Sequence, residues 1–321
     1  MRERSQALLD ALHLRAKLYA LVREFFADRN VLEVETPILS AAGNSEPNIA
    51  SFSTHFSGHV DAGVPTRWLR TSPEYPLKRL LAAGVGDCYE LGRVFRNGEA
   101  GGRHNPEFTM LEWYRVGWDH RRLMEETVAL VEAALGLVGR SAEVHVVSYR
   151  QLFLDELGLD PLHASVDVLR QPLADNGISA DGLTRDDWLD LLITHRIQNT
   201  FPSDRMTVIH DYPATQCALA KIRAGDPPLA ERFELYLGHH EVANGYHELN
   251  DADEQRLRFE RDQSVRRARG LPEMPLDIRL LQTLGDMPDA AGVALGIERL
   301  LMCLANTDAI ADVLAIPFHE A

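Results

Sequence analysis

The chain has 321 residues, a length that allows one large domain or two ordinary ones. Hydrophobic residues make up 45% and charged residues 25% of the sequence, which is ordinary for a folded globular protein and excludes a disordered or low-complexity chain. The formal net charge is −15, so general binding to nucleic acid or to an anionic membrane is not expected.

The N-terminus and the cysteines predict a cytoplasmic protein. No signal-peptide core follows the opening residues, and no apolar run approaches the ~18 residues that a membrane span needs. Cys88, Cys217 and Cys303 are odd in number and widely spaced, so they match neither a zinc pattern nor a disulfide framework. We expect them to be reduced thiols in the core.

The first third of the chain predicts an N-terminal helix followed by short strands and a hairpin. Apolar residues recur with helical spacing over residues 5–29, and residues 40–66 are rich in Gly, Ser, Pro and Asn, as loops are. Ser72 and Pro73 predict a helix start, with Ser72 as the N-cap and Pro73 in the first helical position. The predicted strands are 31–35, 67–71, 88–95 and 108–115, with a polar loop over 97–105.

The remaining two thirds predict a helical segment and then alternating strands and helices. Residues 119–200 have mainly helical periodicity and no acid–base cluster. The later predicted strands are 206–210, 233–237, 241–247 and 293–297, and the later predicted helices are 253–269, 276–284 and 298–305. Because βαβ alternation is not evident, we predict an α+β fold with an antiparallel sheet flanked by helices. We expect one domain over residues 1–321, with a mainly helical insertion at about 118–205.

The segment after residue 92 predicts a binding surface. Arg96 ends a strand at the mouth of a loop, where its planar guanidinium suits a phosphate, although taken alone it is as easily a surface ion-pair arginine. Strand alternation puts Phe108, Met110, Glu112 and Tyr114 on one face. An aromatic ring, a carboxylate and a phenol together fit a surface that stacks a base and accepts an amine better than they fit a core.

A second cluster lies on the two strands near residue 240. Glu234, Glu241, Asn244 and Glu248 offer oxygen atoms to Mg²⁺ and to an ammonium group. Strict alternation leaves Glu241 on the face opposite Asn244 and Glu248, so a bulge near Gly245 is needed to unite them. The alternative is a set of exposed polar strand positions.

A third cluster joins a strand to a helix near the C-terminus. The glycines of the segment 292–300 let the backbone approach a ligand closely, and Arg299 falls in the first turn of the predicted helix, where the peptide dipoles attract phosphate. The alternative is a glycine-spaced turn with an ordinary surface arginine.

These segments, in this order, resemble the three motifs of class II aminoacyl-tRNA synthetases, in the lysine subgroup. Val31-Leu32-Glu33-Val34-Glu35-Thr36-Pro37 is similar to the first motif, which forms the dimer interface in such enzymes. Arg96-Asn97 and His104-Asn105-Pro106-Glu107-Phe108-Thr109 resemble the second motif. Downstream, Asn244-Gly245-Tyr246-His247-Glu248-Leu249 and Ala294-Leu295-Gly296-Ile297-Glu298-Arg299 resemble the last conserved blocks, the latter written Gly-x-Gly-x-x-Arg in the family.

Within that class the chain looks most like the stand-alone elongation factor P lysine ligases. About thirty residues precede the first motif, too few for the anticodon-binding OB domain of lysyl-tRNA synthetases, so no anticodon binding is expected. Ser72-Pro73-Glu74-Tyr75, Glu112-Trp113-Tyr114-Arg115 and Ala294 are similar to the ligases. The resemblance implies a homodimer that uses ATP and Mg²⁺ to attach lysine or (R)-β-lysine to a lysine of elongation factor P, with no membrane partner.

The resemblance also implies roles for individual residues. It gives phosphate contacts to Arg96, His104 and Arg299, with Arg96 and Arg299 as the catalytic pair, and Mg²⁺ to Glu234 and Glu241. The other implied ATP contacts are Asn97, Gly98, Glu99, Asn105, Phe108, Glu241, Val242 and Gly296. The implied amino-acid contacts are Ser72, Pro73, Glu74, Glu112, Tyr114, Asn244, Glu248 and Ala294, the last favouring the β-amino isomer.

One position departs from the pattern, and two other functions stay open. Gly98 stands where the family has a glutamate, so either Glu99 replaces that glutamate or the adenine and amine contacts are weaker. The alternative functions are a truncated synthetase that acylates tRNA or another carrier, and a catalytically silent paralogue. Retention of both arginines and of the acidic pair argues against the silent protein.

Overall fold

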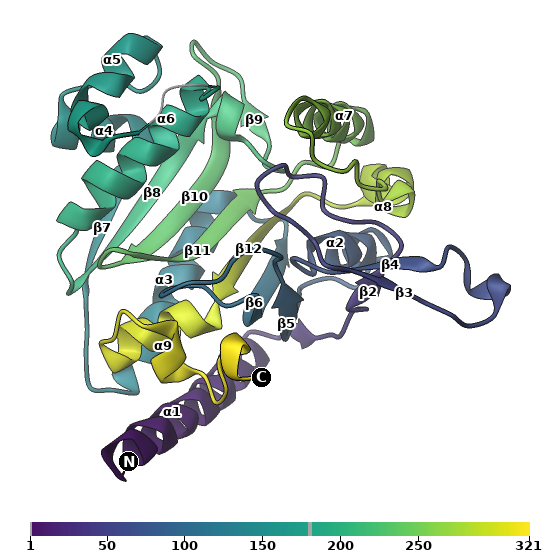
Figure 1. The fold of residues 1–321 in the computed structure, drawn as a ribbon, viewed down its shortest axis with the longest axis horizontal. Coiled ribbons are helices and arrows are strands. Elements are labelled where there is room, and N and C mark those ends of the chain that lie inside the picture. Colours follow the sequence, from purple (N-terminus) through teal and green to yellow (C-terminus); the bar gives the residue numbers. More distant parts are fainter. Residues whose placement is uncertain (1, 179–181) are drawn as a thin grey trace. The chain divides into compact units, whose positions relative to one another are not determined.

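The computed structural model describes residues 2–178 and 182–321 (Figure 1). The chain forms two compact units, the first made of Met1–Trp118 and Leu249–Ala321 and the second of Asp119–Glu248. The predicted single domain with an insertion at about 118–205 stays a prediction.

The first unit has a four-stranded β-sheet in the order β1-β5-β6-β12. Its strands are β1 (Leu32–Glu33), β5 (Cys88–Phe95), β6 (Glu107–Val116) and β12 (Ala290–Gly296). β5, β6 and β12 pair antiparallel, and β1 pairs parallel with β5. A smaller sheet consists of β2 (Leu39–Ser40), β4 (Thr66–Leu69) and β3 (Ser53–His55).

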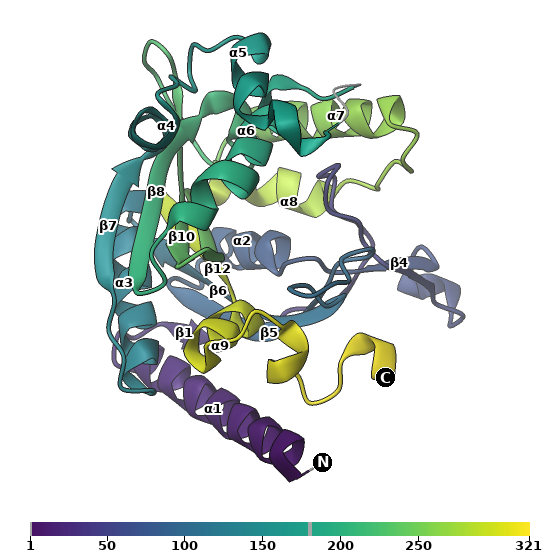
Figure 2. The ribbon, with the colours of Figure 1, turned by 60° about the vertical axis from the view of Figure 1, so that its left-hand side comes forward.

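The N-terminal helix α1 (Arg2–Ala27) covers one face of this sheet (Figure 2). Phe26, fully buried, stacks on Tyr89 of β5 with ring centroids 4.5 Å apart and packs against Trp113 of β6 at 5.4 Å. Trp113 therefore lies on the core face that alternation predicted, and Glu112 and Tyr114 point to the other face. Helix α9 (Ile297–Ala305) contacts both α1 and β6.

The remaining helices of the first unit are α2 (Glu74–Ala82), α7 (Ala252–Ala268) and α8 (Ile278–Thr283). Tyr75 of α2 packs against Phe259 of α7, with ring centroids 5.6 Å apart. Helix α2 begins one residue later than predicted, because Pro73 and not Ser72 is its N-cap. The Ser72 hydroxyl still caps the helix start, since its oxygen accepts a 2.9 Å hydrogen bond from the Glu74 N–H.

The second unit has β11 (His240–His247), β10 (Leu229–Leu237) and β8 (Arg205–Pro213) as antiparallel neighbours, with β7 (Glu143–Ser148) parallel to β8. The short strand β9 (Ile222–Arg223) pairs with β10. Figure 1 shows α4 (Tyr149–Leu157), α5 (Val166–Arg170) and α6 (Arg185–Leu192) on one side of these strands and α3 (His120–Gly136) on the other. The first three bury Phe153, Leu169 and Leu189 against Ile209 and Tyr236 of the sheet.

The predicted antiparallel sheet flanked by helices is confirmed, with one local error. Strand β7 lies inside the segment predicted to be mainly helical. Val144 and Val146 of this edge strand are exposed, so burial does not produce the apolar alternation that would have revealed the strand.

Two findings bear on the predicted surroundings of the protein. Cys88, Cys217 and Cys303 are buried and free, as expected. Within residues 2–178 and 182–321, no helix combines the length and the apolar character needed to cross a membrane.

Candidate active site

Arg96 and Phe108 lie against each other at the end of the β5–β6 hairpin. The Arg96 guanidinium lies over the Phe108 ring, 5.2 Å from its centroid, and 3.7 Å from the Glu99 carboxylate. The Arg96 backbone N–H is fixed by the Pro106 carbonyl at 2.9 Å. The Nε atom of Arg96 is buried and has no hydrogen-bond partner among the described residues. An anionic group of a ligand would satisfy it.

Arg299 and His104 lie against each other in the same unit. Arg299 lies in the first turn of α9, and its Nη2 is 3.0 Å from Nε2 of His104. Burial lowers the pKa of His104, and the charges of Arg299 and Arg96 lower it further. The imidazole is therefore neutral near pH 7, and its Nε2 accepts a hydrogen bond from the Arg299 N–H. The positive charges of Arg96 and Arg299 favour a polyanion at this place.

A buried carboxylate that the sequence reasoning missed holds Arg299 in place. Glu298 is 1% exposed, and its carboxylate accepts a 2.8 Å hydrogen bond from the Thr109 N–H of β6 and a 2.8 Å ion pair from Arg15 of α1. These contacts join α9 to β6 and α1 beside Arg299. Local sequence carries no signal for them, because the partners are 189 and 283 residues away.

Glu112 is the centre of a buried polar cluster on the face of β6 opposite Trp113. Its two carboxylate oxygens accept hydrogen bonds from the Ser72 hydroxyl at 2.7 Å and the Tyr114 hydroxyl at 2.8 Å. Burial raises the pKa of Glu112 to about 7, and the nearby negative charge of Glu74 adds to the shift. A substrate ammonium group would favour the ionised carboxylate and lower that pKa.

Residues of α2 and β12 lie next to the Glu112 cluster. Lys78 of α2 is 1% exposed and donates to the Glu74 carboxylate at 2.6 Å, an i,i+4 pair that the sequence spacing shows although its burial could not be predicted. Ala294 of β12 lies directly opposite Glu112 in the strand register, so its methyl group and the carboxylate share one face. Gly296 lies opposite Met110 on that same face.

A buried ion pair supports the other side of Glu112. Glu90 lies directly opposite Glu112 on β5 and accepts a 2.5 Å hydrogen bond from Arg70. A Cβ atom at Gly92 would lie 2.4 Å from Nη2 of Arg70, so glycine is required there for the arginine to pass. The sequence reasoning missed both residues, since the pair is distant in the chain.

The hairpin loop explains the departure at position 98. Gly98 has φ +86°, a backbone conformation that strains any L side chain, and open space surrounds it. Glutamate is therefore unfavourable at 98, and the carboxylate near Arg96 comes from Glu99. Asn105 is engaged with the backbone, because its Nδ2 donates to the Glu107 carbonyl at 2.6 Å and its Oδ1 accepts from the Phe318 N–H at 3.0 Å.

In the second unit, a β-bulge unites the acidic residues. Glu234 pairs with Asn244 and Tyr236 pairs with Glu241, so Val242 is the extra residue in β11. The prediction of a bulge near Gly245 is wrong, because the register from Ala243 to Tyr246 is regular. The bulge lies at Val242. It turns Glu241 to the face that carries Glu234 and Asn244. The Val242 side chain is 2% exposed, so any contact with a ligand would come from its backbone.

The Glu234 carboxylate lies within a network of donors. It accepts hydrogen bonds from Tyr236 at 2.9 Å and Asn244 Nδ2 at 3.3 Å, and it forms an ion pair with Arg232. Burial raises the pKa of Glu234, opposed by the positive charge of Arg232. Oδ1 of Asn244 is buried and has no hydrogen-bond partner among the described residues. Regular alternation from Asn244 puts Glu248 on the same face.

The structure thus brings the predicted residues together in two sets. The first unit holds Arg96 and Arg299 with Phe108 and His104. It also holds the Glu112 cluster, which includes Ser72, Glu74, Tyr114 and Ala294. The second unit holds Glu234, Glu241 and Asn244 on one face. Pro73 is the N-cap of α2, and Asn97 donates its backbone N–H to the Ala50 carbonyl at 2.8 Å.

Comparison with known proteins identifies this arrangement. The family model described as tRNA synthetases class II (D, K and N) matches residues 1–320. The chain belongs to this family of class II synthetases.

The similarity is more specific at the level of individual relatives. The chain is 46% identical over 311 residues to the elongation factor P–(R)-β-lysine ligase of Yersinia pestis (strain Pestoides F), covering 96% of this chain and 94% of the relative. The ligase of the same name from Yersinia pseudotuberculosis serotype O:1b (strain IP 31758) has the same identity and coverage.

Proposed function

We propose that this protein is an ATP-dependent ligase that activates (R)-β-lysine as an aminoacyl-adenylate and transfers it to a lysine side chain of elongation factor P. The proposal rests on two arginines and a buried carboxylate in one unit of a class II chain. Arg96 lies over the Phe108 ring, Arg299 contacts His104, and the carboxylate is that of Glu112. The 46% identity to ligases of that name supports the particular substrate and partner.

The first step is attack by the amino-acid carboxylate on the α-phosphorus of ATP. An O–P bond forms to give the adenylate, and the bond to pyrophosphate breaks. Arg96 contacts the α-phosphate, Arg299 and His104 contact the outer phosphates, and Phe108 stacks on adenine. No side chain acts as a nucleophile, so positioning and electrostatic stabilisation supply the catalysis.

Glu234 and Glu241 would hold Mg²⁺. They are oxygen donors on one face of adjacent strands, the ligand type that Mg²⁺ prefers. Glu234 accepts hydrogen bonds from Tyr236 and Asn244 and pairs with Arg232, so Mg²⁺ would bind there in exchange for one of these donors. A bound Mg²⁺ would neutralise phosphate charge, and Asn244 and Val242 would contribute neighbouring polar contacts.

The amino-acid substrate is a diamino acid held by carboxylates. Glu112 and Glu74 supply negative charge, and Ser72 and Tyr114 orient Glu112. The resemblance to the ligases adds Glu248 and Asn244, which belong to the second unit, as expected contacts. The Ala294 methyl group narrows the pocket beside Glu112 in favour of the β-amino isomer. One methyl group shifts such discrimination by about 1–3 kcal/mol.

The second step transfers the acyl group to elongation factor P. The neutral ε-amine of the acceptor lysine attacks the adenylate carbonyl, and an amide bond forms. AMP leaves with the bonding electron pair, and the proton that the amine loses passes to solvent. We place the reaction in the cytoplasm, consistent with three free cysteines. A homodimer is proposed through the segment 31–37, near which Leu32, Ile38 and Leu39 are 41–55% exposed.

The test compares acceptors and amino acids in one assay. Purified protein with ATP, Mg²⁺ and radiolabelled lysine or (R)-β-lysine is given elongation factor P or bulk tRNA. We expect label on elongation factor P, with (R)-β-lysine preferred. Label on tRNA in preference to the protein would support a truncated synthetase, and no lysine-dependent ATP–pyrophosphate exchange would support a silent paralogue.

A further inference from the structure

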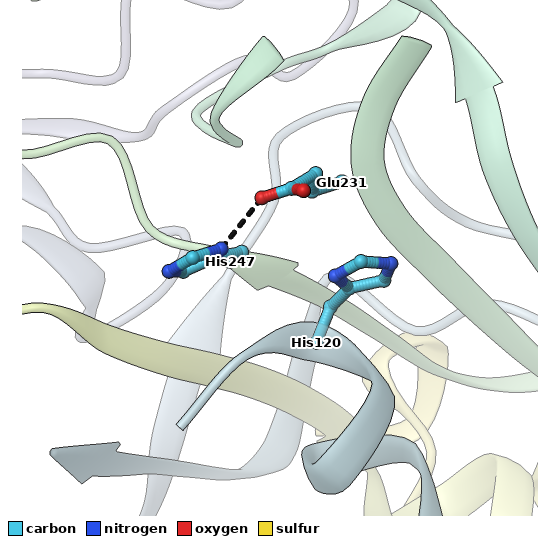
Figure 3. A group of neighbouring side chains, drawn as sticks. All are labelled: His120, Glu231 and His247. Carbon is cyan, nitrogen blue, oxygen red and sulfur yellow. Dashed lines mark hydrogen bonds and ion pairs between the residues drawn. The ribbon is translucent and has the colours of Figure 1, made fainter. Parts of the chain in front are cut away.

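A histidine-rich cluster in the second unit lies on the sheet face opposite the acidic residues. Ligand atoms of His120, Glu231 and His247 all lie within 4.8 Å of one another (Figure 3). Phe233 pairs with Gly245, and alternation puts Glu231 and His247 on the same sheet face as these two residues. Glu234 and Asn244, which also pair, point to the opposite face. The cluster is therefore separate from the carboxylates assigned to Mg²⁺.

His120 is the observation that points to a ligand. It begins α3 and is 2% exposed, yet neither of its ring nitrogens has a hydrogen-bond partner within the described part of the chain. A buried polar group without a partner is costly and rare. Figure 3 shows its imidazole turned toward Glu231 and His247.

His247 and Glu231 already point at each other. Nδ1 of His247 lies 2.6 Å from Oε2 of Glu231, in hydrogen-bond contact. Lys221 lies 3.5 Å from Nε2 of His247, and Arg223 lies 3.5 Å from the other oxygen of Glu231. Lys221 and Arg223 therefore contact Nε2 of His247 and Oε1 of Glu231. The candidate metal-ligand atoms are the other two, Nδ1 of His247 and Oε2 of Glu231.

Asp211 supplies the outer carboxylate that a metal-binding histidine commonly has. Its Oδ1 lies 3.6 Å from Nε2 of His120. Arg121 and Arg223 pair with the other oxygen of Asp211 at 2.9 and 3.0 Å, so an ion-pair network holds this carboxylate. An anionic carboxylate behind Nε2 leaves Nδ1 as the ligating atom and fixes the ring.

We propose that His120, Glu231 and His247 bind a divalent transition metal, with Zn²⁺ as the best fit. Two imidazoles and one carboxylate are a ligand set that zinc uses, with a fourth position for water. Binding replaces the hydrogen bond between His247 and Glu231, because histidine ligates through a deprotonated nitrogen. The ion ties the first turn of α3 to β10 and β11.

The test uses the full-length protein freed of metal by chelation and dialysis, then titrated with Zn²⁺ alone. We expect one zinc per chain by elemental analysis after gel filtration, and a thermal midpoint that rises with zinc concentration because the ion binds the folded state. Co²⁺ in its place should give the intense visible absorption of a tetrahedral site. Absence of stoichiometric zinc in the wild-type protein would overturn the proposal.

Variants assign the ligands. His120→Asn and Glu231→Gln should each lose the bound zinc and the cobalt absorption, while the exposed His195→Asn, a matched change in the same unit, keeps both. Circular dichroism of the metal-free variants checks folding. If a variant is unfolded, the cobalt spectrum of the wild-type protein decides, since two imidazoles, one carboxylate and a water give a four-coordinate site. Equal zinc in all variants, or a six-coordinate cobalt spectrum, would contradict the assignment.

Discussion

Glu112 is the proposed amino-acid contact whose protonation we expect to limit substrate binding most directly. It is 2% exposed and lies in hydrogen-bond contact with Ser72 and Tyr114, and burial raises its pKa to about 7. Only the ionised form attracts an ammonium group, so protonation below pH 7 removes the attraction. We expect the KM for the diamino acid to rise about tenfold from pH 8 to pH 6 in initial-rate ATP–pyrophosphate exchange.

Two controls isolate that effect. The KM for ATP should change much less over the same range, and Glu112→Gln should raise the KM for the amino acid at pH 8 but flatten its pH dependence. An unchanged pH profile in the variant would show that another group titrates.

The Arg299 side chain lies 3.0 Å from His104 in the first turn of α9, and we assign it to the outer phosphates. Arg299→Ala should reduce ATP–pyrophosphate exchange at least about a hundredfold, because a charge aimed at the developing pyrophosphate is lost. Circular dichroism should be unchanged, since the side chain supports no packed core. Near-normal exchange would refute the phosphate role.

The Ala294 methyl group shares a face with the Glu112 carboxylate, across one strand pairing. Ala294→Gly should enlarge the pocket and lower the preference for β-lysine over lysine by about tenfold, equivalent to about 1.4 kcal/mol. Competition of the two amino acids in one exchange assay measures the ratio. The same ratio in variant and wild type would remove Ala294 from the selectivity argument.

At the scale of elements, Glu298 couples α9 to α1 and β6. Its buried carboxylate accepts from Arg15 and from the Thr109 N–H, both at 2.8 Å. Glu298→Gln presents an amide to one of these donors and leaves the Arg15 charge unpaired. We expect a loss of about 3 kcal/mol in the free energy of unfolding, measured by urea titration.

The control is the exposed pair Arg267–Glu273, with both side chains 55% exposed. Glu273→Gln should change the free energy of unfolding by less than about 1 kcal/mol. Glu298→Gln should also raise the KM for ATP, because Arg299 is the next residue. A stable variant with an unchanged KM would show that α9 is positioned by its apolar contacts alone.

The sequence predicts elements well where one residue pattern and one environment agree. The β5 bounds match the predicted 88–95, and Leu111 and Trp113 lie on the predicted core side, because alternation there follows burial. The pattern fails at β7, an exposed edge strand, and at the bulge, since an extra residue at Val242 is fixed by pairing with β10 and not by local preference. The Arg70–Glu90 and Arg15–Glu298 pairs also have no local pattern, because distant segments form them.

At the scale of the whole molecule, the net negative charge repels anions in general, whereas a local group of arginines attracts them. The net charge is −15, yet the charges of Arg96, Arg103 and Arg299 all lower the pKa of His104. A long polyanion meets the general negative field, whereas a short one needs only the local cluster. We therefore expect inorganic triphosphate to compete with ATP in the exchange assay, and bulk tRNA at equal phosphate concentration to inhibit little even at low ionic strength.

The variant Arg299→Lys distinguishes local from general attraction. It keeps the net charge but loses the fork that contacts two phosphate oxygens, so inhibition by triphosphate should weaken severalfold while tRNA stays a poor inhibitor. Strong inhibition by tRNA in the wild-type protein, abolished by salt, would mean that a basic surface outside this cluster outweighs the overall charge. The acceptor would then have to be sought among nucleic acids, because only such a surface would let a chain of this charge hold one.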